Sequence, residues 1–312
     1  MDRTDEKILE ILIENSRLPI SQIAKRTRIS RDIAQYRISR LKSEGIIRDF
    51  TTDINQEKLG YISALFFVCL KAEAEGGFID YINKLDFVSW AGTHLGFWSM
   101  GMAIYGKDTK EVEERFQTIL NKYKTYITDH RFAFYKTTKL FSEKYFNMQK
   151  KYLQKNSHEH YEIDSKDKTI LRHLANNSRS TSVEIAKSVS LTAVAVSQRI
   201  TKLEKSGYIR GYSIYINTLK LGVYLFVFFI QNRNLDQRKK LYSYLENHPR
   251  VSLLLDYIGD PFIEFGIFVK DPYDARAILQ EIKETFPDNK LVDFFLAQED
   301  FISFGAPKCV FE

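Results

Sequence analysis

The chain has 312 residues, of which 44% are hydrophobic and 28% charged, a composition typical of globular proteins with room for two or more domains. The formal net charge of +6 permits a polyanionic partner but does not by itself establish one. The longest apolar runs, residues 61–70 and 223–230, are too short to span a bilayer and favour buried strands. Only two cysteines occur and the N-terminus lacks an apolar signal core, so we expect a cytoplasmic protein without metal or cofactor.

An internal repeat with a period of 162 residues organises the sequence. Residues 2–60 align without a gap on residues 164–222, and 22 of these positions are identical. Beyond this segment the identity fades, but the pattern of apolar and polar runs persists in both copies. We therefore predict a tandem duplication. The predicted boundaries are 1–55 and 163–217 for the first domain of each copy, 56–141 and 218–312 for the second domain of each copy, and 142–162 for a polar linker.

The first 55 residues of each copy predict three short helices and a strand. One apolar face identifies a helix over residues 4–15, and a shorter helix follows over residues 21–26. The third helix begins after Ser30, an N-cap residue type, and stops at Gly45, a C-cap residue type. The alternating segment that follows predicts a small β-wing, so the whole is a winged helix-turn-helix. In the second copy the matching signals are Thr181 with Glu184 at capping-box spacing, Thr192 and Gly207.

The remainder of each copy predicts the order strand, helix, strand, strand, helix, strand, which is the ferredoxin-like βαββαβ unit. The fold class is therefore α+β, with two winged helix-turn-helix domains alternating with two ferredoxin-like sensor domains. The first copy is expected to have strands over residues 61–71, 88–92, 97–105 and 127–140 and helices over 77–85 and 109–123. The second is expected to have strands over 223–231, 251–258, 262–269 and 292–297 and helices over 235–247 and 272–285.

The third helix is the element that should enter the major groove of double-stranded DNA. Seven basic residues against one acid between positions 25 and 42 fit the neutralisation of phosphates. The expected buried stripe of this helix is Ile33, Ala34, Arg37, Ile38 and Leu41. The candidate DNA-binding residues of the first copy are Arg28, Arg31, Asp32, Gln35, Tyr36, Ser39, Arg40 and Lys42.

The corresponding helix of the second copy has a different outward face. Its small, apolar and amide side chains could contact thymine methyl groups and adenine, and Lys202 and Arg210 could hold phosphates. The two heads are therefore predicted to read unlike half-sites, so that the operator is asymmetric. The candidate residues here are Ala193, Val194, Ser197, Gln198, Thr201 and Lys202.

Two arginines, Arg37 and its repeat equivalent Arg199, lie beside the expected buried stripes. We therefore favour a structural role for them, as ion-pair partners of Asp5 and Asp167, over a contact with DNA. A DNA contact remains the open alternative.

These segments resemble the leucine-responsive regulator/AsnC family of transcription factors. The resemblance rests on the pattern DxxDxxIL near the N-terminus, the run LTAVAVSQRITKLEKSGYIRGY at 191–212, and the segments INQEKLG and INTLKLG that follow each wing. It covers nearly the whole chain as two copies. It implies sensor sheets that pair, here within one chain as an internal pseudo-dimer, and it leaves further homo-oligomers open. It also implies an amino-acid effector.

The sequence departs from this family in the loop before the third sensor strand. There the family has a glycine followed three residues later by an aspartate, whereas here Ser99 follows Gly96 and Phe262 follows Gly259. A carboxylate is the natural partner of an amino group, so a free amino acid as effector is in doubt. The candidate effector-binding residues are His94, Gly96, Trp98, Ser99 and Gly259.

The sequence leaves two alternative functions open, an enzyme and an interaction protein. An enzyme similar to the sirohaem decarboxylases of the same architecture would need a cluster of arginine and histidine, of which only His94, His130 and Arg131 are candidates. An interaction protein with degenerate heads would not need the basic third helix. The pair His158 and His160 has weak metal-ligand spacing and no cysteine beside it, so a solvated segment is favoured. The favoured prediction is a DNA-binding regulator that is not an enzyme.

Overall fold

The computed structural model describes residues 1–141, 144, 160–258, 262–303 and 305–312, and these residues form two compact units. One unit contains the described residues of 1–61, 150–217 and 304–312, and the other those of 62–149 and 218–303. Each unit therefore combines both copies of the repeat. The sequence boundaries at 55 and 217 lie close to the observed ones, whereas most of the predicted linker, including His158, lies outside the described residues.

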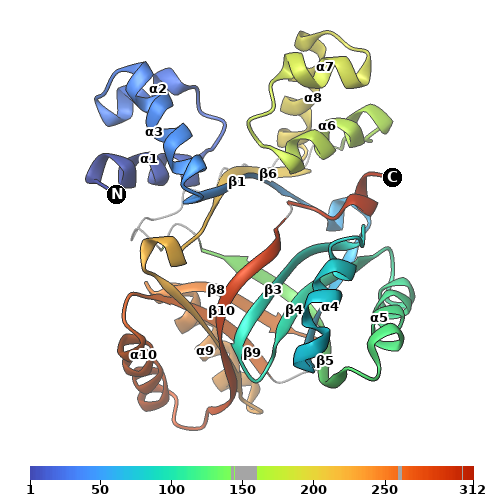
Figure 1. Ribbon diagram of the computed structural model, residues 1–312, viewed down its shortest axis with the longest axis vertical. Coiled ribbons are helices and arrows are strands. Elements are labelled where there is room, and N and C mark those ends of the chain that lie inside the picture. Colours follow the sequence, from blue (N-terminus) through green and yellow to red (C-terminus); the bar gives the residue numbers. More distant parts are fainter. Residues whose placement is uncertain (142–143, 145–159, 259–261, 304) are drawn as a thin grey trace. The chain divides into compact units, whose positions relative to one another are not determined.

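The first unit, which we call the head unit, holds two similar groups of three helices (Figure 1). The predicted capping residues Ser30, Thr192 and Thr181 each accept a hydrogen bond from the first turn of the helix they precede. Gly45 and Gly207 follow the recognition helices with positive φ angles of 68° and 76°, as C-terminal caps do. The helices are α1 (Arg3–Glu14), α2 (Ile20–Thr27) and α3 (Arg31–Ser43), then α6 (Ser165–Asn176), α7 (Ser182–Val189) and α8 (Ala193–Lys205).

The two strands that follow the recognition helices pair with each other. Strand β1 (Ile47–Ile54) and strand β6 (Ile209–Ile216) form a two-stranded antiparallel sheet in which Thr51 faces Ser213. The strand predicted after each third helix is confirmed, and its partner is the equivalent strand of the other copy. Neither strand segment contains a turn that would let it fold back, and each one satisfies its backbone hydrogen bonds on the other copy instead.

The heads also exchange parts of their cores across this sheet. Strand β1 packs on α6 of the second copy, and β6 packs on α1 of the first. Ile54 is fully buried in the apolar cluster of the second head, and Thr52 Oγ1 donates to the Leu174 carbonyl at 2.6 Å. Ser213 Oγ makes the related bond to the Ile13 carbonyl at 3.1 Å. Neither head is therefore complete without the other copy.

The last residues of the chain belong to the head unit. The sequence-based prediction had instead placed residues up to 312 in the second sensor domain. Ala306, Cys309 and Val310 are buried, the last two in the short helix η5 (Lys308–Phe311). The Tyr61 hydroxyl donates to the Cys309 carbonyl at 2.7 Å, and the Gln56 amide donates to the Gly305 carbonyl at 2.8 Å. Ala306 belongs to the apolar cluster of the second head and η5 contacts α6, which explains the position of this segment.

The second unit has the predicted strand and helix order in both copies. The first copy supplies β2 (Ile62–Leu70), α4 (Glu75–Ile82), β3 (Val88–Gly96), β4 (Met100–Gly106), α5 (Thr109–Tyr123) and β5 (Ile127–Leu140). The second supplies β7 (Tyr224–Gln231), α9 (Leu235–Asn247), β8 (Val251–Tyr257), β9 (Phe262–Val269), α10 (Pro272–Thr285) and β10 (Lys290–Ser303). Short 3₁₀ helices occur at Glu57–Leu59, Ala72–Ala74 and Leu219–Leu221. The ferredoxin-like prediction is confirmed, with β3 and β10 longer than expected.

The two ferredoxin-like sheets join edge to edge into one closed barrel. The strand order is β10-β3-β4-β2-β5-β8-β9-β7, with β7 paired to β10. The joints between copies are the pairs β5–β8 and β10–β3. The helices α4 and α5 cover the outside of one sheet through an apolar cluster around Phe66, and α9 and α10 cover the other around Phe265 (Figure 1). Both sheets are therefore buried on two faces, as their continuous apolar strands predicted.

Gly305 is required where the C-terminal segment passes β1. A Cβ atom at this position would collide with the Thr52 carbonyl oxygen, which is backbone and cannot rotate away. We expect Gly305→Ala to lower the free energy of unfolding by roughly 1–3 kcal/mol, the usual cost of overpacking. Urea unfolding would measure it. The matched control is Gly211→Ala, since a Cβ there meets nothing within 4 Å. An equal response of both variants would contradict the close approach.

Candidate nucleic-acid interface

Each head contains a helix-turn-helix with the same unusual turn. Arg28 ends α2 in the left-handed region at φ 60°, and its repeat equivalent Ser190 ends α7 at φ 51°. The backbone N–H of Ile29 then bonds the Ala24 carbonyl at 3.1 Å and turns the chain into the next helix. Non-glycine residues seldom adopt this conformation, so the turn is imposed by the packing of the two helices it joins.

The outward face of α3 is available to a ligand. Ala34, Ile38 and Leu41 form its buried stripe at helical spacing. Ile33 is 47% exposed, so its predicted burial was wrong, because it lies about 100° around the helix from Ala34. Of the predicted DNA-binding residues, Arg40 is half-buried, and the exposed ones are Arg28, Arg31, Asp32, Gln35, Tyr36, Ser39 and Lys42.

Arg37 has the structural role that the sequence favoured. Its Nη1 lies 2.7 Å from the Asp2 carboxylate and 2.8 Å from that of Asp5, which is 1% exposed. Arg40 Nη2 approaches the other Asp5 oxygen at 2.6 Å. The hydrogen bond from Arg37 holds the pKa of Asp2 down at about 2. Arg199 repeats the arrangement with Asp164 and Asp167, at 2.9 Å each. Arg37 therefore links α1 to α3, and Arg199 links α6 to α8.

Most of the basic side chains near α3 form ion pairs with acidic side chains. Among residues 25–42, Arg26 pairs with Glu14, Arg37 and Arg40 with Asp5, and Lys42 with Asp49. Lys25, Arg28 and Arg31 are exposed and make no ion pair with any residue that the structure describes. These three cations surround the turn and the start of α3, where a phosphate backbone beside the groove would lie.

The second head presents a nearly neutral surface at the same place. The repeat equivalents of Lys25, Arg28 and Arg31 are Lys187, Ser190 and Ala193. Val194 is 68% exposed in the first turn of α8, where the first head has Asp32. The predicted residues Ser197, Gln198, Thr201 and Lys202 are also exposed, and Ala193 is half-buried.

The described residues among those predicted to bind an effector are buried to different degrees. His94 and Trp98 are buried inside the barrel, and the His94 ring stacks on Phe295 with 3.8 Å between ring centroids. Burial lowers the pKa of His94 to about 3. Ser99 is occupied, since its Oγ accepts a hydrogen bond from the Leu70 N–H at 3.0 Å. Gly96 packs directly on the backbone of β10. Gly259 lies outside the described residues.

Sequence reasoning missed a polar cluster inside the barrel that both copies build. The guanidinium of Arg131 lies between three aromatic rings, 4.8 Å from that of Phe262 and 5.2 Å from that of Phe229. Its charge acts on two acids of the second copy, the buried Glu264 and the half-buried Asp293. Burial raises the pKa of Glu264 to about 7, against a hydrogen bond from the Tyr257 hydroxyl. Alternation along β9 places Glu264 inward, but only the strand pairing reveals its partner from the other copy.

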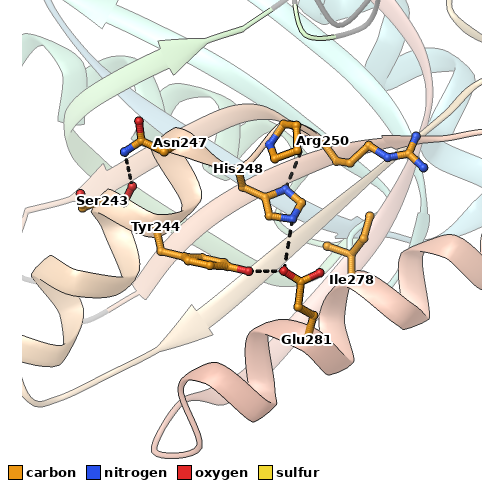
Figure 2. A pocket seen from close by; sticks show the side chains of 8 residues that line it. Ser243, Tyr244, Asn247, His248, Arg250, Ile278 and Glu281 are labelled. Carbon is orange, nitrogen blue, oxygen red and sulfur yellow. Dashed lines mark hydrogen bonds and ion pairs between the residues drawn. The ribbon is translucent and has the colours of Figure 1, made fainter.

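An open hollow of about 650 Å³ lies between α9 and α10 (Figure 2). Its wall includes the Tyr244 and His248 side chains, which converge on the Glu281 carboxylate, with His248 Nε2 at 3.9 Å from Glu281 Oε1. Burial lowers the pKa of His248, so its ring favours the neutral form. None of the sequence-predicted effector residues lines this hollow.

Within the part of the chain that the structure describes, no three His, Cys, Asp or Glu side chains gather as metal ligands would. Nor does any helix in that part have the length and apolar character to cross a membrane.

Known proteins resemble this chain in the helix-turn-helix segments of both heads. The profile of the winged helix-turn-helix DNA-binding family matches residues 1–48 and again residues 163–210. The HTH-type transcriptional regulator FL11 of Pyrococcus furiosus is 36% identical over 85 residues, which is 27% of this chain and 55% of that regulator. An uncharacterized HTH-type transcriptional regulator of Pyrococcus abyssi is 30% identical over 126 residues, 40% of this chain and 85% of that protein. The match to FL11 thus spans about half of its length.

Among solved structures, the sirohaem decarboxylase NirDL superposes with a TM-score of 0.63 over 96% of this chain and 93% of its own. Its sequence identity to this chain is 14%. Such a likeness establishes a shared fold and says nothing about shared chemistry.

Arg37→Ala is expected to destabilise the head unit by roughly 1–3 kcal/mol, because the buried Asp5 loses one of its two arginine partners. Since Arg37 also depresses the pKa of Asp2 from 3.8 to about 2, part of the difference from wild type should fade as the pH falls from 4 to 2. Urea unfolding at several pH values measures both effects. The control Arg31→Ala, which breaks no ion pair, should stay within 0.5 kcal/mol or so of wild type.

Glu264→Gln is expected to change how stability depends on pH. The carboxyl titrates near 4.5 when unfolded and at about 7 in the barrel, so its stabilising contribution is complete below pH 4.5 and is lost as the pH rises through 7. Relative to the variant, wild type should lose roughly 1–3 kcal/mol between pH 5 and 8. Thermal unfolding across this range, with the exposed Glu113→Gln on α5 as control, measures it. Parallel profiles for wild type and Glu264→Gln would refute the buried acid.

Proposed function

Because the chain belongs to the leucine-responsive regulator/AsnC family of HTH-type transcriptional regulators, as a tandem duplication, we propose that it regulates transcription by binding a specific double-stranded DNA site. Each recognition helix, α3 and α8, would lie in a major groove, one in each half of the operator. Occupancy of the promoter then blocks or assists the transcription machinery. This role places the protein where chromosomal DNA is, in the cytoplasm.

One observation carries the proposal. The first head exposes polar side chains of α3, among them Gln35 and Ser39, beside three cations that form no ion pair with an acid in the described part of the chain. Arg31 and Gln35 have the donors that pair with base edges in the major groove, and Lys25 and Arg28 lie where phosphates would flank it.

The exposed face of the second head differs chemically from that of the first, and this difference supports recognition of two unlike half-sites. Its face offers Val194 to a thymine methyl group and Gln198 to adenine, with Lys202 as the nearby cation. Since β1 and β6 hold both heads in one unit, the two faces would be presented to DNA together and in a fixed order. The proposed operator is therefore asymmetric.

We favour a regulator over a decarboxylase. In the described part of the barrel, His94 is 6% exposed and stacked on Phe295, while aromatic rings enclose Arg131. These side chains pack on aromatic rings, so they are less available to a tetrapyrrole than a free cluster of arginine and histidine would be. The α9–α10 hollow is lined by Glu281 together with Arg250, so it does not offer the uniformly basic wall that a large anion needs.

Selection of bound fragments from random DNA tests the function and its asymmetry. The full-length protein should return a site with two different halves, and Arg31→Ala should relax base preference in one half at a cost of about 1–3 kcal/mol for the lost contact. Lys25→Ala is the matched control, because a phosphate contact weakens all sequences alike. Lys42 serves less well as this control, since it already pairs with Asp49.

A perfect palindrome would refute the asymmetric operator. Equal losses on selected and random DNA for Arg31→Ala would refute its base-reading role. If wild type shows no preference for duplexes at low ionic strength, the regulator itself is refuted.

A further inference from the structure

The junction between the two heads contains a pair of arginines from equivalent positions of the repeat. Arg17 and Arg179 directly follow Ser16 and Ser178, whose hydroxyl oxygens lie 2.6 Å apart. Arg17 donates from Nη1 to the Ser178 carbonyl, and Arg179 donates from Nη1 to the Ser16 carbonyl. Each arginine thus bonds the residue immediately before the other one. This reciprocal arrangement brings two positive charges close together.

No acid neutralises this pair. Neither Arg17 nor Arg179 makes an ion pair with any carboxylate among the described residues, and Glu204 instead accepts from the Tyr212 hydroxyl at 2.6 Å. Burial, and after it the charge of Arg17, lowers the pKa of Arg179. The rings of Tyr212 and Phe50 lie 5.2 and 5.6 Å from the two guanidinium groups. Ring faces attract cations but leave their charge in place.

Most of the donors of these arginines remain unused. Arg17 Nη1 also donates to the Ser180 carbonyl at 3.0 Å, and Arg179 Nη1 also donates to the Leu18 carbonyl at 3.3 Å. All the hydrogen bonds of these two side chains among the described residues come from Nη1. Within the described structure, Nε and Nη2 have no hydrogen-bond partner and are not among the buried unpartnered atoms, so they reach solvent. A guanidinium presents these donors as a rigid fork that matches the oxygens of a phosphate.

We propose that Arg17 and Arg179 form a clamp for a single phosphate group at the junction of the heads. The bound oxyanion accepts from both forks and removes the repulsion between the two charges, so binding also fixes the heads against each other. The phosphate is either a phosphodiester of the DNA between the half-sites, a source that rests on the proposed function, or free inorganic phosphate.

The first arm of the test needs no DNA. Thermal unfolding of the full-length protein is followed in sodium phosphate and in sodium chloride of equal ionic strength. Wild type should gain roughly 2–4 °C in phosphate. Arg17→Gln and Arg179→Gln should lose this gain, while Arg276→Gln on α10, an exposed control, keeps it. Should the glutamine variants fail to fold, Arg179→Lys retains the charge without the fork and should show a smaller gain.

The second arm measures duplex affinity against salt concentration. A phosphodiester in the clamp predicts that the double variant Arg17→Gln/Arg179→Gln lowers the log–log slope by about 0.9. A lost phosphate gain with an unchanged slope assigns the clamp to free phosphate. A phosphate gain that survives in both glutamine variants, together with an unchanged slope, overturns the clamp while DNA binding stands. If wild type binds no duplex, the proposed function fails, and the unfolding arm still decides the clamp.

Discussion

The antiparallel pairing of β1 with β6 is the constraint on which the head unit depends. Because these strands bond to each other and pack on the first helix of the opposite copy, the heads are halves of one folded body. Ile54 makes this concrete, since a residue of the first copy is fully buried in the core of the second. The separation of α3 and α8 is therefore a property of this shared body and not of a flexible connection between two domains.

Duplication within one chain has let equivalent positions acquire different chemistry. Arg210 of β6 pairs with Asp53 at 2.7 Å, whereas its equivalent Arg48 lies over the Tyr215 ring at 5.5 Å. Inside the barrel, Arg131 acts on Asp293, which occupies the equivalent position one repeat later. Two identical subunits would place like charges at such a pair of positions. The fused chain can instead place opposite charges at these two positions.

The sequence predicted the local elements well because they follow from short-range patterns. The capping residues, the apolar stripes and the positions of Gly45 and Gly207 all depend on neighbours within one turn of helix. The pairing of Arg37 with Asp5 could also be anticipated, because a charged residue beside a buried stripe needs a partner. The exposed face of α3 followed from its helical period.

What could not be predicted depends on which distant segments meet. The pairing of β1 with β6 and the burial of Cys309 near Tyr61 join segments far apart in the sequence, and the ion pairs of Arg26, Arg40 and Lys42 each join two different elements. The same limit applies to the candidate site. A count of basic residues does not show that Lys25, Arg28 and Arg31 lack an ion pair among the described residues. That depends on where the acidic side chains of other elements lie.

The burial of residues 306–310 in the second head has a consequence for synthesis on the ribosome. Helices α6, α7 and α8 emerge roughly a hundred residues earlier than Ala306, yet their apolar cluster lacks this side chain until the barrel strands have been translated. A nascent chain therefore holds an unfinished second head during the whole interval in which β7 to β10 appear. Its maturation is delayed until the sensor sheet is available to fold, so partly made chains lack a finished pair of reading heads.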